Sequence, residues 1–404
     1  MSSKPITEPK DRRPHTERRV TNGSGVGPFD ADTLLSDRST QIIVCCGSGG
    51  VGKTTTAAAL ALRAAEQGRT VCVLTIDPAR RLAQSMGLVE LDNTPRPVRG
   101  IDTSAGGSLD AMMLDMKTTF DEVVEAHASP EKAAEILANP FYVALSSSFA
   151  GTQEYMAMEK LGQLHGEGRW DLIIVDTPPS RSALDFLDAP ERLSSLLDGK
   201  FIKLLLAPAR GPARLLTAGF GLVTAALNKI LGARVLTDMQ TFIAAFDTLF
   251  GGFRQRAEAT FALLQDRGTA FLVVAVPEPA AMREAAYFVE RLAADDMPLS
   301  AVVVNRVHDQ NAAAMSAVDA ESAAGRLAGG TKVQQQTGEL LAVHAERMKL
   351  ADRENYLRQR FVAAHKNVQV VPVPALDTDV HDLDALRKIG GFLSSPEREP
   401  RAKS

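Results

Sequence analysis

Short apolar runs alternate with longer helical patterns from Gln41 almost to the end of the chain. The apolar runs are rich in Val, Ile and Leu and are bounded by Gly, Pro or charged residues, which is typical of strands. This alternation predicts a mainly parallel sheet covered by helices, that is, a doubly wound α/β fold. The expected strands are 41–46, 70–76, 110–114, 171–176, 269–276, 300–305 and 367–371.

Three segments contain more chain than simple crossover connections need. Residues 117–166 and 180–265 hold long helical patterns without strand signals, and we expect the two blocks to meet as an inserted helical subdomain. Residues 308–366 are rich in Ala, Gln and charged residues and are interrupted at Gly329 and Gly330. We expect this third segment to be a variable insertion that is helical in parts.

The two ends of the chain have a different composition from its middle. Residues 1–36 are rich in Lys, Arg, Pro, Ser, Thr and Gly, and such a segment cannot bury enough apolar surface to offset the entropy of ordering. We therefore expect a disordered tail over 1–36, a folded domain over 37–394 and a frayed polar end over 395–404.

Charge and hydropathy narrow the class of protein. The formal net charge of −4 over 404 residues argues against a protein whose main partner is bulk nucleic acid. The N-terminus has no apolar core of a secretory signal, so we expect a cytoplasmic protein, with peripheral attachment to a membrane left open. The long apolar stretch between Arg214 and Lys229 is shorter than the roughly 20 residues of a spanning helix, so no transmembrane helix is predicted.

The cysteines exclude several kinds of metal site. Cys45, Cys46 and Cys72 all fall in expected strands, where a buried cysteine usually behaves as a small hydrophobic residue. Because the sequence has no Cys-x-x-Cys pair, one chain cannot assemble an iron–sulfur cluster or a zinc site built from cysteines.

A glycine-rich loop joins the first expected strand to an Ala-rich helical stretch. It consists of Gly47, Ser48, Gly49, Gly50, Val51, Gly52, Lys53, Thr54 and Thr55. In such a phosphate-binding loop, or P-loop, backbone N–H groups surround the phosphates of a nucleotide and the lysine contacts the β- and γ-phosphates. The hydroxyl of Thr54 is then a ligand for Mg²⁺. We expect ATP and Mg²⁺ to bind at this loop.

Two carboxylates end other expected strands at the same edge of the sheet. Asp176 follows the aliphatic run 172–175, where an acidic residue can orient Mg²⁺ through a water, although such a residue can also cap a turn. Asp77 opens an Asp-Pro-Ala motif, which is either an ordinary turn or a carboxylate that positions the water attacking the γ-phosphate. The neighbouring P-loop favours the functional interpretation of both.

Taken together, these motifs resemble the ArsA-type ATPases. This family includes the arsenite-pump ATPase and the targeting ATPase for tail-anchored membrane proteins, and it belongs to the dimeric P-loop class that includes MinD-type ATPases. The resemblance spans about Gln41 to Gly390 and rests on motifs that occur in the family's order: the P-loop, Asp77-Pro78-Ala79, Asp176-Thr177-Pro178-Pro179, and Val304-Asn305.

The resemblance also implies further roles around the nucleotide. Asn305 would hydrogen-bond adenine, although a single asparagine after a strand is usually a turn residue. Pro372 and Pro374 lie in a proline-rich loop, 372–376, that would pack on the base. Glu278 matches a family glutamate that lies near the nucleotide across the dimer interface.

The chain departs from the family at a position that bears on catalysis. Relatives have a lysine immediately before the paired glycines, which reaches across the dimer to the partner's phosphates, and this chain has Ser48. A cation placed on developing phosphoryl charge contributes several kcal/mol, so its loss matters. We expect a paralogous subunit to donate the lysine in trans. Alternatively, Arg80 or Arg181 replaces it, or hydrolysis is slow.

Apolar helical residues raise the question of a client. Residues 201–206 and 215–223 are apolar on more than one helix face, and by resemblance they would form part of a groove for a client helix. Ordinary packing within the subdomain explains them equally well. A cluster of methionines invites the same comparison, but we expect most of them to be core residues: Met112, Met113, Met116, Met156 and Met158.

The function predicted from the sequence is that of a Mg²⁺-dependent, ATP-hydrolysing dimeric switch. It would couple hydrolysis to capture and release of a membrane-related client or to regulation of a transporter. One alternative is a regulatory subunit that binds ATP and hydrolyses it weakly because of Ser48. Another is a MinD-like positioning ATPase, which would need a terminal amphipathic membrane helix, and 383–393 is short and contains Gly390 and Gly391.

Overall fold

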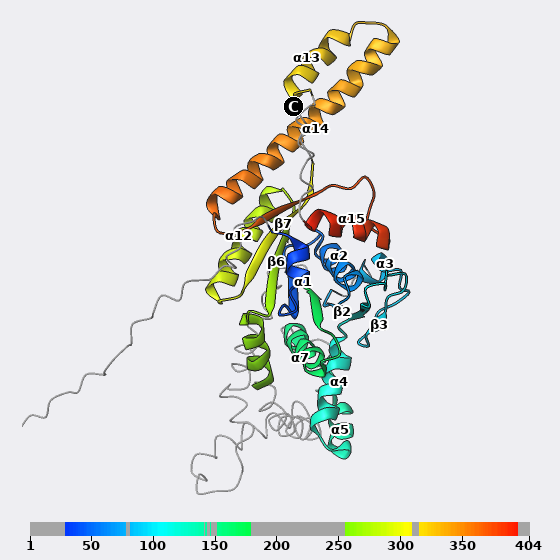
Figure 1. The fold of residues 1–404 in the computed structure, drawn as a ribbon, viewed down its shortest axis with the longest axis vertical. Helices are drawn as coiled ribbons and strands as arrows, with labels where there is room; N and C mark the ends of the chain where they lie inside the picture. Colours follow the sequence, from blue (N-terminus) through cyan, green and yellow to red (C-terminus); the bar gives the residue numbers. More distant parts are fainter. Residues whose placement is uncertain are drawn as a thin grey trace, which may run out of the picture.

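The computed structural model describes residues 29–77, 81–140, 142, 143, 146, 152–178, 255–308 and 315–394. Within these residues the strands form one eight-stranded sheet in the order β3-β4-β2-β5-β1-β6-β7-β8 (Figure 1). The strands are β1 (Ile42–Cys46), β2 (Thr70–Thr75), β3 (Arg96–Pro97), β4 (Ser108–Met113), β5 (Leu172–Asp176), β6 (Thr269–Ala275), β7 (Leu299–Val307) and β8 (Val370–Pro374).

All neighbouring strands pair in parallel except β3, which is antiparallel to β4. Each of the seven strands expected from the sequence has a counterpart in this sheet, and only the two-residue β3 was not predicted. Because helices cover both faces of a mainly parallel sheet, the doubly wound α/β fold of a P-loop protein is confirmed.

The two faces of the sheet are covered by different helices. The side chains of β1 alternate, so that Ile42 and Val44 face one core while Ile43 and Cys45 face the other. On the first face lie α4 (Met116–His127), α5 (Pro130–Leu137), α7 (Thr152–Glu167) and most of α12 (Pro279–Ala294). On the second face lie α1 (Ala31–Ser36), α2 (Lys53–Glu66), α3 (Arg81–Ser85) and α15 (Leu383–Leu393).

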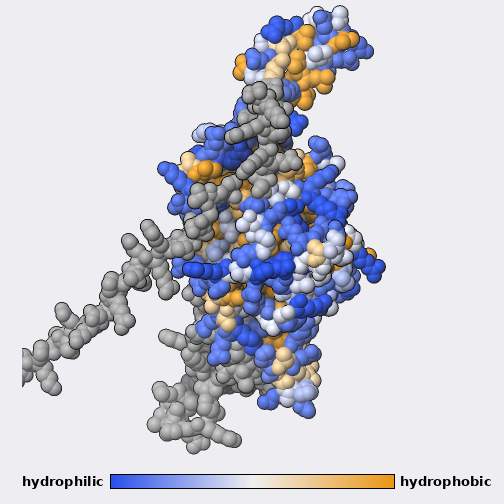
Figure 2. Space-filling view, viewed as in Figure 1, coloured by the Kyte–Doolittle hydropathy of each residue, from blue (hydrophilic) through white to orange (hydrophobic). Residues whose placement is uncertain are grey.

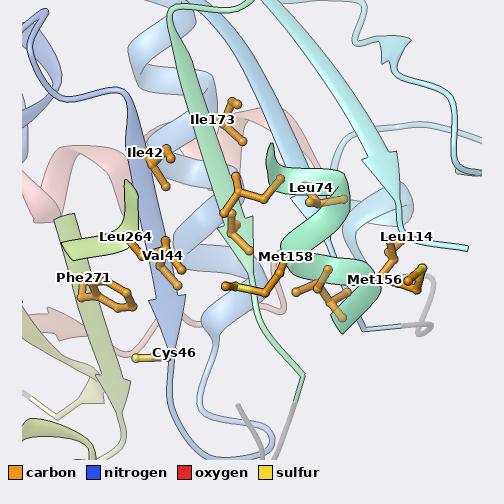
Figure 3. Close-up of a cluster of buried hydrophobic side chains, with 14 of the residues drawn as sticks. Ile42, Val44, Cys46, Leu74, Leu114, Met156, Met158, Ile173, Leu264 and Phe271 are labelled. Atoms are coloured by element: carbon orange, nitrogen blue, oxygen red, sulfur yellow. The ribbon is translucent and has the colours of Figure 1, made fainter. Parts of the chain in front are cut away.

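The close-up in Figure 3 shows the first core, where Met158 of α7 points toward Val44 of β1 and Met156 lies beside Leu114. Met112 also lies in this core and Met116 packs against it partly buried, whereas the partly buried Met113 packs against the second core. The prediction that most of these methionines are core residues is therefore confirmed. The three cysteines are likewise fully buried in β1 and β2.

The ordered domain begins before the predicted boundary at residue 37. Residues 31–36 form α1, whose first turn is capped by the side chain of Asp30. Leu35 is fully buried, and the guanidinium of Arg63 donates to both carboxylate oxygens of Asp32 at 2.6 and 2.7 Å. The predicted tail was therefore wrong for residues 29–36, because two apolar side chains and one ion pair suffice to dock this short helix on α2.

The helical subdomain is described only in part. The block predicted over 117–166 contains α4, α5 and α7, and residues 255–265 of the second block are also helical. The apolar segments 201–206 and 215–223 lie outside the described residues. Among the helices that are described, none is both long and apolar enough to cross a membrane.

The segment predicted as an insertion contains a helical hairpin that projects from the sheet domain (Figure 1). Helix α13 (Ala317–Leu327) and helix α14 (Lys332–Ala364) are joined at Gly329 and Gly330, where the sequence predicted an interruption. Thr331 and Gln334 form a capping box at the start of α14. The hairpin leaves the domain after β7 and returns to it before β8.

Candidate active site

The P-loop connects the carboxyl end of β1 to the first turn of α2, the place predicted for it. Gly47 adopts a φ of +147°, and a Cβ on this residue would lie 2.1 Å from the carbonyl oxygen of Val274 in β6. Only glycine fits here, because the loop passes directly over the neighbouring strand.

Gly52 is the N-cap of α2 and has a left-handed φ of +99°. The first turn of the helix contains no acidic residue, so its free N–H groups and the positive end of the helix dipole face the loop without compensation. This arrangement suits an anion such as a phosphate.

The side chain of Lys53 places a positive charge inside the P-loop. Its side chain is buried, and Nζ donates a 2.8 Å hydrogen bond to the carbonyl oxygen of Ser48. Burial lowers the pKa of Lys53, while the charges of Asp176 and Asp77 act in the opposite direction. The ammonium group is thus close to both carboxylates predicted from the sequence, and it is folded back onto the loop itself.

Asp176 lies at the centre of the site, completely buried at the end of β5. Its Oδ2 accepts two hydrogen bonds, one from the hydroxyl of Thr54 at 2.7 Å and one from the hydroxyl of Thr75 at 2.8 Å. Its Oδ1 is buried and has no hydrogen-bond partner among the described residues. Burial raises the pKa of Asp176 to about 6, against the opposing effects of the two hydroxyls and Lys53.

These groups fit a magnesium ion. A partnerless buried carboxylate oxygen is costly unless a cation or water satisfies it, and Mg²⁺ prefers oxygen ligands and retains several waters. The hydroxyl of Thr54 would bind the ion directly, and Asp176 would bind it through a water. When bound, the ion would neutralise phosphate charge, and its charge would also favour the ionised form of Asp176.

Asp77 lies two residues beyond Thr75 and is partly buried. Its backbone N–H donates a 3.3 Å hydrogen bond to the hydroxyl of Thr75, the same hydroxyl that donates to Asp176. The structure therefore brings Asp77, Asp176 and Lys53 together, although the role of Asp77 in positioning a water stays a prediction. The candidate replacement cations Arg80 and Arg181 lie outside the described residues.

Asn305 contacts the P-loop, which the sequence did not predict. Its side-chain amide donates a 2.9 Å hydrogen bond to the carbonyl oxygen of Val51, and its Oδ1 accepts from the backbone of Arg306. The amide nitrogen would lie 2.2 Å from a Cβ on Gly52, so this side chain packs directly against the loop. A bulge in β7 and a left-handed φ of 58° at Arg306 accompany the contact. Recognition of adenine by Asn305 stays a prediction.

The remaining predicted residues lie at the same edge of the sheet. Glu278 is exposed at the N-cap of α12, just beyond β6. Pro372 and Pro374 were expected in a loop, but they lie in β8, opposite Val304 and Val307 of β7. Proline is tolerated there because β8 is the edge strand and needs no N–H donor on its outer side. Contact of these three residues with a nucleotide stays a prediction.

Thr75 is the site residue that sequence reasoning missed. It is buried at the end of β2 and links the two carboxylate motifs through one hydroxyl. The only signal in the sequence is a hydroxyl residue two positions before Asp77. Thr75 can be recognised as a site residue only when the register of the sheet places it opposite Asp176.

The segment that contains this fold and the P-loop matches a known protein family. The family model described as anion-transporting ATPase matches residues 40–337. The chain belongs to the anion-transporting ATPase family. The resemblance drawn from the motifs is thereby confirmed, and the chain is an ATPase of the ArsA type.

Several curated members of this family are similar to the chain. A protein named ATPase GET3 from Malassezia globosa is 29% identical over 170 residues, covering 42% of this chain and 48% of that protein. An ATPase ASNA1 homolog from Cryptosporidium parvum is 27% identical over 288 residues, covering 69% and 70% of the two chains. An ATPase get3 from Schizosaccharomyces japonicus is 22% identical over 369 residues, covering 91% and 97%. The match therefore spans about half of the first relative and nearly all of the third.

Proposed function

We propose that this chain is a Mg²⁺-dependent ATPase switch that works as a dimer and couples ATP hydrolysis to capture and release of a membrane-related client or to regulation of a transporter. The observation that supports it best is the cluster beneath the P-loop, in which the partly buried Thr54 and the buried Thr75 both donate to the buried Asp176. The carboxylate oxygen of Asp176 that has no partner among the described residues is suited to a hydrated cation, and the neighbouring Lys53 is suited to a phosphate.

The residues around this cluster have separate tasks in this proposal. Lys53 leaves the carbonyl of Ser48 to contact the phosphates, and the N–H groups at the start of α2 bind phosphate oxygens. Asp77 accepts a hydrogen bond from the attacking water and orients it. Asn305 contacts adenine while it supports the loop, and Glu278 approaches the nucleotide of the partner subunit.

Ser48 determines which partner completes the site. A serine at this position cannot reach or neutralise the phosphates of a facing subunit, whereas a preorganised cation there would lower the barrier of phosphoryl transfer. We therefore propose that a paralogous subunit with a lysine at the equivalent position supplies it in trans. Arg80 and Arg181 of this chain are the alternative sources.

The client is proposed from the resemblance to targeting ATPases for tail-anchored membrane proteins. Such a client would carry an apolar helix, and the chain segments 201–206 and 215–223 are the apolar residues suited to it. A second candidate function is an ATP-binding regulatory subunit that hydrolyses slowly, and Ser48 is the observation that favours it.

The test combines native mass with turnover. The protein is isolated from its own cells and weighed with ATP, Mg²⁺ and a mimic of the phosphoryl transition state. We expect a nucleotide-dependent dimer whose second chain carries a lysine before its paired glycines. A homodimer with rapid hydrolysis would overturn donation in trans.

The variant Asp77→Asn distinguishes the two candidate functions, the ATP-hydrolysing switch and the slowly hydrolysing regulatory subunit. It should bind ATP with unchanged affinity and lose turnover in the complex, with Asp319→Asn, which is exposed on α13 and lies outside every nucleotide motif, as the matched control. Turnover that is negligible in the wild-type complex and unchanged in Asp77→Asn would favour the regulatory subunit instead.

A further inference from the structure

Only part of helix α14 contacts the sheet domain. It extends over 33 residues, and its C-terminal part contacts α12 and β7 of the domain. The N-terminal part projects away with α13 (Figure 1). Figure 2 shows hydrophobic surface on this projecting hairpin.

One face of the projecting part carries a regular pattern. We call it the outer stripe, and it consists of Val333, Gln336, Leu340, Val343, Arg347 and Leu350. The spacing of three and four residues is that of a coiled-coil seam, with apolar residues at four of the six positions. The side chains of Leu340 and Val343 are 72% and 68% exposed, which is high for aliphatic residues at such positions.

The stripe does not face α13. The seam between the two helices is made by other residues, among them the buried Gly338 and Ala345. A Cβ on Gly338 would lie 3.2 Å from the carbonyl oxygen of Ala324 in α13, so the helices meet closely on that face. At 100° per residue, the residues at the centre of the outer stripe point roughly 140–160° away from Gly338 and Ala345 of this seam. The hairpin's own packing therefore leaves it uncovered.

The same spacing continues into the part of α14 that is covered. Beyond Leu350, steps of four, three and four residues lead to Glu354, Leu357 and Phe361. Both Glu354 and Phe361 are buried against the domain. His308, just after β7, donates through its backbone N–H to Glu354 at 2.8 Å and contacts it through Nδ1 at 2.9 Å. The stripe is thus the continuation of a packing face beyond the edge of its own domain.

We propose that the outer stripe binds the outer stripe of a second copy of this chain, with the two α14 helices antiparallel. About the midpoint between Leu340 and Val343, the stripe is symmetric. Val333 lies opposite Leu350 of the second copy, Leu340 lies opposite Val343, and Gln336 lies opposite Arg347. Apolar residues then meet apolar residues, and the charged residue meets a neutral amide.

The parallel arrangement is excluded by the domain itself. A parallel second helix would have to continue along Glu354 and Phe361, and that surface is occupied by the sheet domain. It would also place Arg347 against its own copy. In the antiparallel arrangement the second α14 begins opposite Ala351, which is buried and marks the start of the covered part. The length of the uncovered stripe therefore matches the length of helix available to cover it.

This contact is distinct from the dimer of the proposed function. It needs no nucleotide, and it places the two sheet domains at opposite ends of the paired hairpins. Four aliphatic side chains from each copy bury much less than the roughly 1,600 Å² of a standard stable interface. We therefore expect a weak association that becomes strong when a second interface joins the same molecules.

The first test measures mass in solution without nucleotide or Mg²⁺, so that the proposed ATP-dependent dimer does not contribute. Sedimentation of the full chain should show a mass that rises from 43.3 kDa towards twice that value with increasing concentration. Leu340→Glu should remain monomeric. Val318→Glu is the matched control, because Val318 is 74% exposed on α13 and lies outside the stripe. A wild-type chain that stays monomeric at near-millimolar concentration would overturn the proposal.

The second test distinguishes the orientation by disulfide crosslinking. The three native cysteines are buried and do not interfere. A mixture of Gln336→Cys and Arg347→Cys should form a mixed disulfide, whereas Gln336→Cys alone should not, because the two copies of residue 336 would be about 16 Å apart along the helices. Crosslinking of Gln336→Cys alone would overturn the antiparallel pairing. The ATPase rate of Leu340→Glu reports on the proposed function separately and should be unchanged.

Discussion

The hydroxyl of Thr75 donates a 2.8 Å hydrogen bond to Oδ2 of Asp176 and accepts one from the backbone of Asp77. The end of β2 thereby holds the carboxylate that ends β5. Because Thr54 donates to the same oxygen, the other oxygen of Asp176 accepts no hydrogen bond from either hydroxyl. This arrangement fixes which face of the carboxylate is available to a hydrated cation.

Replacing Thr75 by Val should therefore weaken catalysis without unfolding the protein. Valine has the same shape, and the change removes one hydrogen bond to a buried charged group, worth about 1.5–3 kcal/mol. We expect kcat to fall by roughly 10–100-fold and the Mg²⁺ concentration for half-maximal activity to rise. Thr75→Ser is the control, because it keeps the hydroxyl and should retain activity. Unchanged kcat and Mg²⁺ dependence in Thr75→Val would contradict this positioning role.

Much of this site could be anticipated because its motifs are local. Gly47, Gly52 and Lys53 act through the backbone of one short loop between a strand and a helix, and that context is visible in the sequence. Asp176 could also be placed, since the carboxyl ends of parallel strands meet at one edge. Site residues that belong to a motif with a fixed spacing along the chain could therefore be predicted from the sequence.

Other features depend on register and on distant contacts. Thr75 became recognisable only when the pairing of β2 with β5 put it opposite Asp176. The contact of Asn305 with Val51 joins residues 254 positions apart. Residues 31–36 include Leu34 and Leu35 but directly follow a polar segment, and only Arg63 and the core of α2 show why they are ordered. These contacts depend on tertiary packing, which cannot be read from a single sequence.

Asn305 allows a test that separates adenine recognition from support of the P-loop. If it reads adenine, Asn305→Ala should weaken ATP binding much more than GTP binding, because only adenine loses its hydrogen-bonding partner. If it only supports Val51, both affinities should fall equally. We expect the first result, with a loss of roughly tenfold for ATP from one hydrogen bond. Titration calorimetry with both nucleotides measures the two losses, and equal losses would remove Asn305 from the adenine site.

The pKa of Asp176 predicts how stability depends on pH without ligands. An unfolded aspartate titrates near 3.8, whereas burial raises the pKa of Asp176 to about 6. The folded protein therefore binds the proton more tightly, and stability is lost as the pH rises from the lower value through the higher one. Asp176→Asn, which is neutral throughout, should have a higher Tm than the wild type well above pH 6.

That difference should vanish at a pH below both values, where the wild-type carboxyl is protonated as well. Scanning calorimetry in a chelator, without nucleotide, measures it. Saturating Mg²⁺ and ATP should reverse the sign, because the ion then favours the charged wild-type side chain. A constant difference between the two proteins at all pH values would show that Asp176 is not the group that titrates.

Ser48 offers the most direct test of how the site is completed. Its carbonyl accepts a hydrogen bond from Lys53, and its side chain occupies the position where the resemblance of the motifs led us to expect a lysine. Ser48→Lys in a homodimer would let each subunit supply a cation to the other. We expect kcat to rise at least tenfold, since comparable cations contribute about 10³–10⁵ in other phosphoryl-transfer enzymes. Ser48→Met is the matched control, because it adds length without charge. If both variants hydrolyse ATP at the wild-type rate, the cation comes from within the chain, and Arg80 and Arg181 become the residues to replace.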